Sequence, residues 1–427
     1  MRKLFISIIF FILGVIVPAQ DNSLSLSDAL SRALENNYGI LISRADTRIA
    51  GINNDWGNAG RYPVVGFDVS SLNSQDLDDN NFSGRLNAGL GLTWTIFDGF
   101  RVNLTKDKLG QLENLAAGRA DIVVENTIED VILAYYQVLL NQERLSILEK
   151  VMKLSEDRYN YEEARREFGN SVTFNVLTAK NNYLSDKAAY LSQEVTCRNS
   201  VRYLDFLMGL ESHETWQFIE PFKADTTDYV LSDLLDKMMS GNVSLLNQYI
   251  NILLARNNTE LSQSDYFPSL RLSAGVDNSN TFRPSNMQGS SFSAYANATL
   301  SYDIYKAGQR RRSLEIAGIE EDIAGLEKEE LSRSLNNQLL SIYDLYNVRK
   351  ELLAIAGENV EAAELNLQIA DEKYRSGVIN SFNYRDIQLI YLNAAYQEVQ
   401  AIYNLISSQA ALSRITGGFI SSVNDEN

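Results

Sequence analysis

Two long segments of the chain alternate between apolar and polar residues. In residues 84–97 every second position from Leu86 is apolar, and the positions between are polar or glycine. Residues 291–305 alternate in the same way, and shorter alternating segments at 63–72 and 268–278 precede them. Alternation over about nine residues or more is typical of strands that cross a membrane with one lipid face and one wet face. A soluble sandwich would alternate too, but its strands usually span only about five or six residues.

The stretches between paired strands, Asn73 to Asn81 and Asp277 to Gly289, are polar and are predicted as long hairpin loops. The strand pattern therefore predicts two hairpins, and so four strands in the chain.

Two much longer segments follow a helical pattern. Residues 99–167 and 308–375 contain no proline, and each would form a helix on the order of 100 Å long. Apolar residues in the second recur every seven positions, which favours a left-handed supercoil: Leu339, Tyr346, Leu353, Val360, Leu367 and Tyr374. Each segment ends at a glycine-containing turn, and the chain then returns as a helix through 172–210 and 381–416. Two long helical hairpins are therefore predicted.

The order of these elements occurs twice. Leu26-Ser27-Asp28-Ala29-Leu30 matches Leu231-Ser232-Asp233-Leu234-Leu235 at an offset of 205 residues. Further along the offset is 208, which relates Gly169 to Gly377. We therefore predict one repeat over residues 20–222 and a second over 223–427, each with two strands and one helical hairpin.

Four strands are too few for a closed barrel in a bilayer, where the smallest barrels have about eight. An open sheet in lipid would leave unpaired backbone groups, at several kcal/mol each. The barrel must therefore be shared between chains. Two chains would supply eight strands and three would supply twelve, and a conduit favours three or more because eight strands leave little lumen.

The N-terminus has the pattern of a secretory signal. Arg2 and Lys3 precede an apolar run, and small residues around Ala19 suit cleavage, so residues 1–19 are predicted as a signal peptide; an uncleaved anchor is the alternative. The mature chain keeps 36 basic residues against 55 acidic ones, a formal charge of −19, which disfavours a nucleic-acid partner. One Cys and one His cannot form a Cys/His zinc cluster, and no enzyme motif is present, so we expect no cofactor and no catalysis.

Several short motifs together resemble the TolC family of outer-membrane efflux channels. They are the opening segment Leu26 to Leu30, the strand entries at Pro63 and Pro268, the strand exits Trp94 to Gly99 and Tyr305 to Gly308, and the turn Lys373 to Gly377. The resemblance implies an α+β membrane protein, a homotrimer with a shared twelve-stranded transmembrane β-barrel continuous with a periplasmic α-helical barrel. It also implies the outer membrane of a Gram-negative bacterium, contact with its lipid, a periplasmic adaptor and an inner-membrane transporter as partners, and passive conduction to the exterior.

The resemblance also implies a gate near the second turn. The family's gating tyrosine matches Tyr374, and its acidic partner matches Asn175. Its two acidic rings match Asn383 and Asp386, so only the second keeps its charge, and its gating arginine is replaced by Ile379. We expect a neutral contact between Tyr374 and Asn175 and one constriction ring from Asp386. Ordinary turn residues without a gating role are the alternative.

The two turns are the expected docking points for the adaptor: Phe168, Gly169 and Asn170 in the first, and Ser376, Gly377 and Val378 in the second. The alternative function for the whole chain is a periplasmic coiled-coil adaptor or structural rod without a pore.

Overall fold

The computed structural model describes residues 23–76, 81–211, 216–282 and 289–419. The predicted signal segment 1–19 lies outside the described residues. The first half runs through a short strand β1 (Ser23–Leu24), α1 (Leu26–Asn36), α2 (Tyr38–Asn53), β2 (Val64–Asp76), β3 (Asn81–Phe97), α3 (Arg101–Glu167) and α4 (Thr173–Leu207). The second half runs through β4 (Gln217–Phe218), α5 (Leu231–Gly241), α6 (Val243–Ser264), β5 (Ser269–Phe282), β6 (Gly289–Ser301), α7 (Gln309–Arg375) and α8 (Ser381–Ile415).

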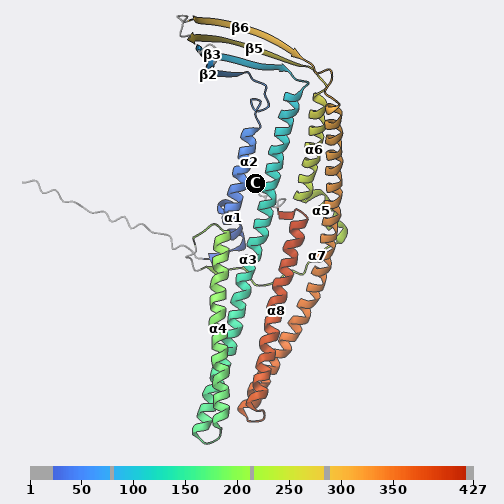
Figure 1. The fold of residues 1–427 in the computed structure, drawn as a ribbon. Coiled ribbons are helices and arrows are strands. Elements are labelled where there is room, and N and C mark those ends of the chain that lie inside the picture. The colour runs from blue at the N-terminus through green and yellow to red at the C-terminus, as the bar shows by residue number, and fades with distance from the viewer. Residues whose placement is uncertain (1–22, 77–80, 212–215, 283–288, 420–427) are drawn as a thin grey trace, which may run out of the picture.

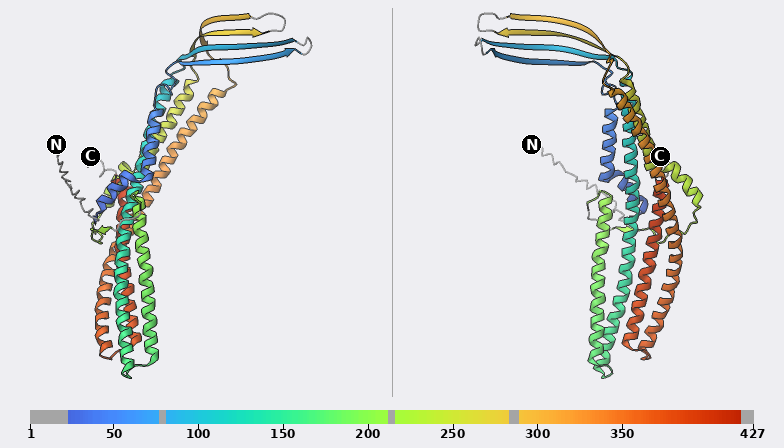
Figure 2. Two further views of the ribbon diagram at one scale, coloured as in Figure 1. Left: turned by 90° about the vertical axis from the view of Figure 1, so that its left-hand side faces the viewer. Right: turned by 45° about the vertical axis from the view of Figure 1, so that its right-hand side comes forward.

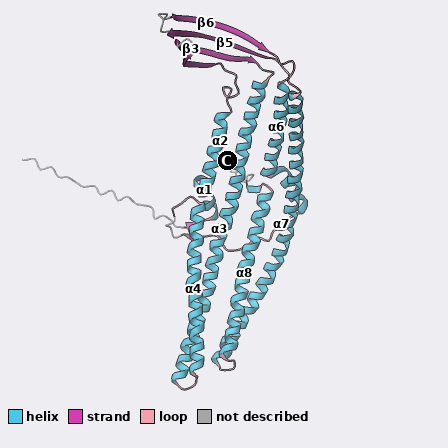
Figure 3. Cartoon of the chain, viewed as in Figure 1, coloured by secondary structure: helices cyan, strands magenta, loops and turns pink. Residues whose placement is uncertain are grey.

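Matched elements have matched lengths. Both α3 and α7 contain 67 residues, and both α4 and α8 contain 35. A glycine with positive φ precedes each long helix, Gly99 at +71° before Phe100 and α3, and Gly308 at +72° before α7. At these glycines the chain turns out of the strand region. Figure 3 shows the long strands at one end of the molecule and helices over the rest of its length.

The four long strands form one antiparallel sheet in the order β2-β3-β5-β6. Its register aligns the alternating faces across all four strands. One row is apolar and consists of Phe67, Leu90, Val276 and Ala294, and the adjacent row consists of Asp68, Gly89, Asp277 and Ser293. One face is therefore apolar and the other polar, as the alternation predicts.

The predicted hairpin loops are wrong in length. Pairing continues to Asp76 with Asn81 and to Thr281 with Gly289, so most of the predicted loop residues are strand. Polarity misleads here because backbone hydrogen bonds sustain a ladder whatever the side chains are. In the opposite direction, β6 ends at Ser301, not at residue 305.

The helices form a single curved layer in two tiers (Figure 1). Next to the sheet, α2, α3, α6 and α7 pack side by side in that order, and farther away the order is α4, α3, α8, α7. The two 67-residue helices run through both tiers, while α2 and α4, and likewise α6 and α8, follow one another along the layer. Figure 2 shows the sheet extending sideways from one end of this layer.

The predicted seven-residue pattern is confirmed in α7. Leu339, Tyr346, Leu367 and Tyr374 are buried against α8 and its neighbours, and Leu353 and Val360 are partly buried. The companion series contains the buried alanines Ala356, Ala363 and Ala370, whose small side chains let α8 approach closely. A further apolar cluster joins α1, α3 and α4 around Val131, Tyr135 and Leu204.

Both edges of the helical layer carry exposed apolar residues. On one edge they lie along α2 and α4: Ile42, Ile49, Ile52, Leu177, Leu184, Leu191 and Val195. On the other edge they lie along α7: Ile316, Ile319, Ile323, Val348, Ile355 and Ile369. Within residues 42–52, 177–195, 316–323 and 348–355 the spacings are three, four or seven, which places each group on one face of its helix. These faces have no partner in the described chain. No described helix is long and apolar enough to span a bilayer.

Candidate functional site

The two helical hairpins end in equivalent turns. In the first, Gly169 has φ +76° and Asn170 N–H donates to Arg165 O at 2.8 Å. In the second, Gly377 has φ +78° and Val378 N–H donates to Lys373 O at 2.9 Å. These bonds cap the last carbonyls of α3 and α7, and they require a left-handed residue that glycine adopts without strain. We call these two turns, residues 168–171 and 376–379, the tips.

The tips are exposed and partly apolar. All six residues predicted for docking are exposed, and Phe168 reaches 80% exposure. Phe174 and Phe382, one from the first turn of each returning helix, lie with ring centroids 6.1 Å apart. The two tips therefore lie together at one end of the molecule and present aromatic surface to solvent.

The structure buries Tyr374 between the two hairpins. Its side chain is 4% exposed, and its hydroxyl donates to Glu162 Oε1 of α3 at 2.5 Å. Its ring stacks on Tyr384 of α8 with centroids 4.9 Å apart, and it meets Tyr161 edge to face. The tyrosine thus joins α7 to α3 and α8.

The expected contact between Tyr374 and Asn175 is wrong for the protomer, because the tyrosine hydroxyl is bonded to Glu162 instead. Asn175 lies in the first turn of α4 and is half-buried. Asn175 was expected from its distance along the chain to Gly169. The rotation of α3 instead directs Glu162 at Tyr374.

Glu162 is a buried carboxylate with several partners. It is 1% exposed, accepts a bond of 2.5 Å from the Ser171 hydroxyl, and lies 3.6 Å from the Arg165 guanidinium. Burial, and then the bond to Glu162, raises the pKa of Tyr374 above its ordinary value of 10.0. Tyr374 is therefore a neutral donor throughout the physiological pH range, and Glu162 is its acceptor.

A second buried bond joins the hairpins farther from the tips. Arg385 of α8 makes a bidentate ion pair with Asp186 of α4, at 2.6 and 2.7 Å. Both side chains are largely buried. Nearby, Arg158 of α3 is buried, and its guanidinium makes no hydrogen bond to another described residue. Burial lowers the pKa of Arg158.

The remaining predicted gate residues face away from this cluster. Asn383 and Asp386 lie on α8 and are exposed, whereas Tyr384 between them is buried. The structure therefore does not bring the four predicted residues together within one protomer. Tyr374 is buried, and Asn175 lies on α4. Asn383 and Asp386 lie on the solvent-exposed face of α8, which we call its open face.

Sequence reasoning missed Glu162, Asp186 and Arg385. A signal for the first was present, because the buried positions Val151, Ser155, Arg158 and Glu162 of α3 follow the spacing of a helical core stripe. Polar residues at core positions commonly have a specific partner. In the described part of the chain, no group of three or more His, Cys, Asp or Glu residues could hold a metal ion.

Solved structures share this fold. A structure of CusC covers 92% of this chain and 92% of its own, with a TM-score of 0.76 at 16% identity. The outer-membrane channel OprN aligns over 92% of this chain and 90% of its own, with a TM-score of 0.73 at 19% identity. At these identities the likeness establishes the fold of the chain.

Sequence comparison identifies the family. The outer membrane protein TolC of Escherichia coli K12 is 25% identical over 380 residues, 83% of this chain and 74% of TolC. The probable efflux pump outer membrane protein TtgC of Pseudomonas putida is 20% identical over 396 residues, 88% of this chain and 81% of that protein. The family described as outer membrane efflux protein matches residues 29–210 and 234–418, and so both hairpins. This match selects the channel interpretation over a rod without a pore. The chain belongs to the outer membrane efflux protein family, and it is an exit duct of efflux systems in the Gram-negative outer membrane.

Proposed function

We propose that three copies of this chain close into one conduit, with a twelve-stranded barrel above a tunnel of twelve helices. The observation that carries the proposal is that the molecule is open at the same two edges in every tier. The sheet ends at β2 and β6, and the helical layer ends at α2 and α4 on one side and at α7 on the other. Pairing the free strand edges and burying the apolar stripes against another copy both lower the free energy of the assembly.

The two apolar stripes of the lower tier match in height. Leu191 of α4 is as far along the chain after Gly169 as Ile355 of α7 is before Gly377. The same equality holds for Leu177 and Ile369, closer to the tips. Since α4 and α7 run in opposite directions from neighbouring tips, these residues meet when α7 of one copy packs on α4 of the next.

Charged residues beside the stripes match as well. Arg202 follows Gly169 at the same separation at which Asp344 precedes Gly377. The separations of Lys187 and Glu358 from these two glycines agree to within one position. Opposite charges at equal heights favour one register of the two helices. A contact between two different surfaces of the same chain generates a ring when its rotation closes.

Cysteine cross-linking tests this assembly. In a Cys197→Ser background, Leu191→Cys combined with Ile355→Cys should form covalent species up to a trimer after treatment with a short bis-maleimide. The control combines Leu191→Cys with Ile369→Cys, which is displaced by about four helical turns, or roughly 21 Å along the helix. The control should stay monomeric on a denaturing gel. Cross-linking in neither pair, or equally in both, contradicts the proposed interface.

The partners belong to the same proposal. A periplasmic adaptor docks on the tips, where Phe168 and Val378 are strongly exposed, and it connects the channel to an inner-membrane transporter. The channel itself conducts passively and catalyses no reaction. The relatives' names include an efflux pump for toluene and a cation efflux system, so they do not point to one substrate for this chain.

We also propose a gate near the tips. In the closed state, the bond from Tyr374 to Glu162 and the ion pair between Arg385 and Asp186 hold the α7–α8 hairpin against the α3–α4 hairpin. Asp386 and Asn383, on the open face of α8, form the constriction around the axis of the trimer. Opening separates the hairpins and breaks both buried bonds.

A further inference from the structure

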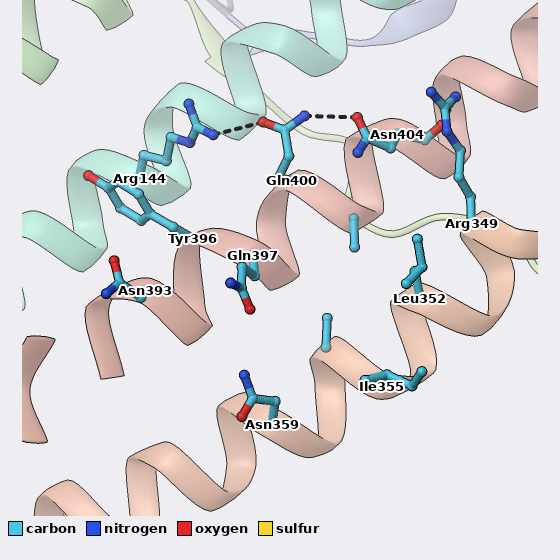
Figure 4. Close-up of a pocket in the computed structure, with 12 residues that line it drawn as sticks. Arg144, Arg349, Leu352, Ile355, Asn359, Asn393, Tyr396, Gln397, Gln400 and Asn404 are labelled. Carbon is cyan, nitrogen blue, oxygen red and sulfur yellow. Dashed lines mark hydrogen bonds between the residues drawn. The ribbon is translucent and has the colours of Figure 1, made fainter. Parts of the chain in front are cut away.

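A hollow of about 700 Å³ lies between α7 and α8, beside Arg144 of α3 (Figure 4). Its apolar lining includes Leu352, Ala356 and Ala401. The carboxamides of Asn359 and Gln397 face one another across it. Neither carboxamide makes a hydrogen bond to another residue that the structure describes. The volume lies within the range of sites for drug-sized molecules, which combine apolar walls with a few polar groups.

The hollow and the connecting segment 225–229 lie on opposite sides of α7. Lys350 forms an ion pair with Asp228 of that segment, and the Tyr346 hydroxyl donates to Thr227 O at 2.5 Å. Asn359 lies about two and a half helical turns beyond Lys350, which places it on the opposite side of the helix. The segment covers one face of the helical layer, and the hollow opens on the other.

The positions of the lining residues on α8 independently show on which face of the helical layer the hollow opens. Asn393, Gln397, Gln400 and Asn404 follow Asp386 along this helix by about two, three, four and five turns respectively. Because these separations are close to whole turns, all four residues lie within roughly 40° of Asp386 around the helix. The hollow therefore lies on the face of α8 that carries the proposed constriction, and in the proposed trimer it opens into the tunnel.

The charge of the lining is unusual for this acidic chain. The charged side chains that line the hollow are Arg144 and Arg349, and no carboxylate among the described residues lines it. Arg144 is held in place by a bond of 2.7 Å to Gln400 Oε1 and by the ring of Tyr396, whose centroid is 5.3 Å from the guanidinium carbon. Two fixed positive charges beside an apolar and amide surface favour a ligand with an apolar body and a negative group.

We propose that this hollow is a binding site for amphipathic organic anions passing through the tunnel. The proposal rests on the proposed trimer for its position inside the conduit. The apolar body contacts Leu352, Ala356 and Ala401. The carboxamides of Asn359 and Gln397 supply hydrogen bonds, and Arg144 attracts the negative group. Three such sites surround the axis of the assembly.

Fluorescence titration of the purified assembly with anilinonaphthalene sulfonate tests the site. The change Gln397→Trp fills the hollow and should weaken binding by about tenfold or more. The control Gln368→Trp introduces the same residue on the side of α7 that faces away from the hollow. Gln368 lies about five whole turns after Lys350, so the two residues are on the same side of the helix. It should leave binding unchanged. Equal binding by the two variants overturns the site.

A second comparison tests the role of charge. Arg144→Gln should weaken the sulfonate by about fivefold or more, and should leave the uncharged probe phenylnaphthylamine within about twofold. Equal losses for both probes contradict recognition of an anion.

Position in the tunnel is tested separately in a planar bilayer. The sulfonate should reduce the single-channel current of the wild type, and of Gln368→Trp, more than that of Gln397→Trp. Binding without any reduction overturns the position inside the conduit. The cross-linking result decides the trimer by itself, so failure of this site is distinguishable from failure of the assembly.

Discussion

The Tyr374 hydroxyl donates a hydrogen bond to Glu162, 212 residues earlier in the chain, and both side chains are buried. The bond connects α7 to α3, and so it connects one helical hairpin to the other. A neutral donor on a buried carboxylate contributes about 1.5–3 kcal/mol, more than an ordinary hydrogen bond, because the carboxylate has no water to replace its partner.

Tyr374→Phe should raise the open population of the channel about 10- to 150-fold, which is the range that this energy implies. Single-channel recordings in planar bilayers measure the open fraction directly. Tyr159→Phe is the matched control, since its hydroxyl bonds the half-buried Glu163 at 3.1 Å on the same helix as Glu162. If both variants close as well as the wild type, the bond between Tyr374 and Glu162 does not hold the gate.

Asp186→Asn should destabilise the closed assembly by about 3–5 kcal/mol, because it leaves the Arg385 guanidinium buried without its counter-charge. The double change Asp186→Leu with Arg385→Met should recover most of this loss, since it removes both charges. Thermal unfolding followed by circular dichroism measures the effect. Glu149→Gln serves as the control, because its ion pair with Lys153 is exposed to solvent and contributes little to stability. Similar losses from both pairs would contradict this account.

Gly377→Trp should abolish efflux in cells while the trimer still assembles. The tip glycine has φ +78° and nothing within 4 Å of the position of a side chain, so a bulky residue both strains the turn and projects into the docking surface. Gly377→Asn is the control, because asparagine tolerates the left-handed region. The readout is the growth of host cells on a panel of toxic compounds. Normal resistance in the tryptophan variant would show that the tip does not dock the adaptor.

Asp386→Ala should move the cation preference of the channel toward no preference. The carboxylate lies on the exposed face of α8, and in the trimer three copies would surround the constriction. Reversal potentials under a salt gradient measure the preference. Glu372→Ala removes an exposed carboxylate close to the second tip on α7 and should leave the potential unchanged. A wild-type preference in Asp386→Ala would remove this residue from the conducting path.

Stability should depend on pH through Glu125 of α3. Burial, partly opposed by Arg414, raises the pKa of Glu125 from 4.5 to about 7, and the nearby Asp121 and Glu129 add to the increase. Because the folded state holds this proton more tightly than the unfolded state, stability falls as pH rises from about 4.5 to about 7 and stays lower above that. This pKa shift corresponds to a decrease of roughly 3 kcal/mol in the free energy of unfolding between low and high pH.

Glu125→Gln should therefore stabilise the protein at pH 8 and have little effect at pH 4. Melting temperatures across this pH range, compared with those of the wild type, measure the difference. A stabilisation that is equal at both pH values would show that the charge of Glu125 is not its cause.

Much of the fold could be predicted from residue patterns that act locally. The alternation in residues 84–97 predicted β3 within three residues of its observed ends, and the uninterrupted helical pattern predicted α3 and α7 within two. The hairpin loops were predicted poorly, because polar residues such as Asn73 and Asn280 occupy strand positions whose backbone pairing does not depend on polarity.

The candidate site, too, could be predicted only in part. The tips were predicted from glycine and from the end of each helical pattern, and the structure places Gly169 and Gly377 where a left-handed residue caps each helix. The partner of Tyr374 was not predicted correctly, although the burial of Tyr374 followed from its seven-residue series. Arg385 and Asp186 gave no local signal of their pairing, which joins positions 199 residues apart.

The sequence by itself determined the elements, their double occurrence and the faces of each strand and long helix. These follow from periods of two and seven residues and from glycine, which act within a few residues of one another. Only the tertiary structure decided that Tyr374 meets Glu162, that Arg385 meets Asp186, and that a hollow remains between α7 and α8. Such contacts depend on the rotation and height of separate helices, and a shift of one residue turns a side chain by about 100° and so changes its partner.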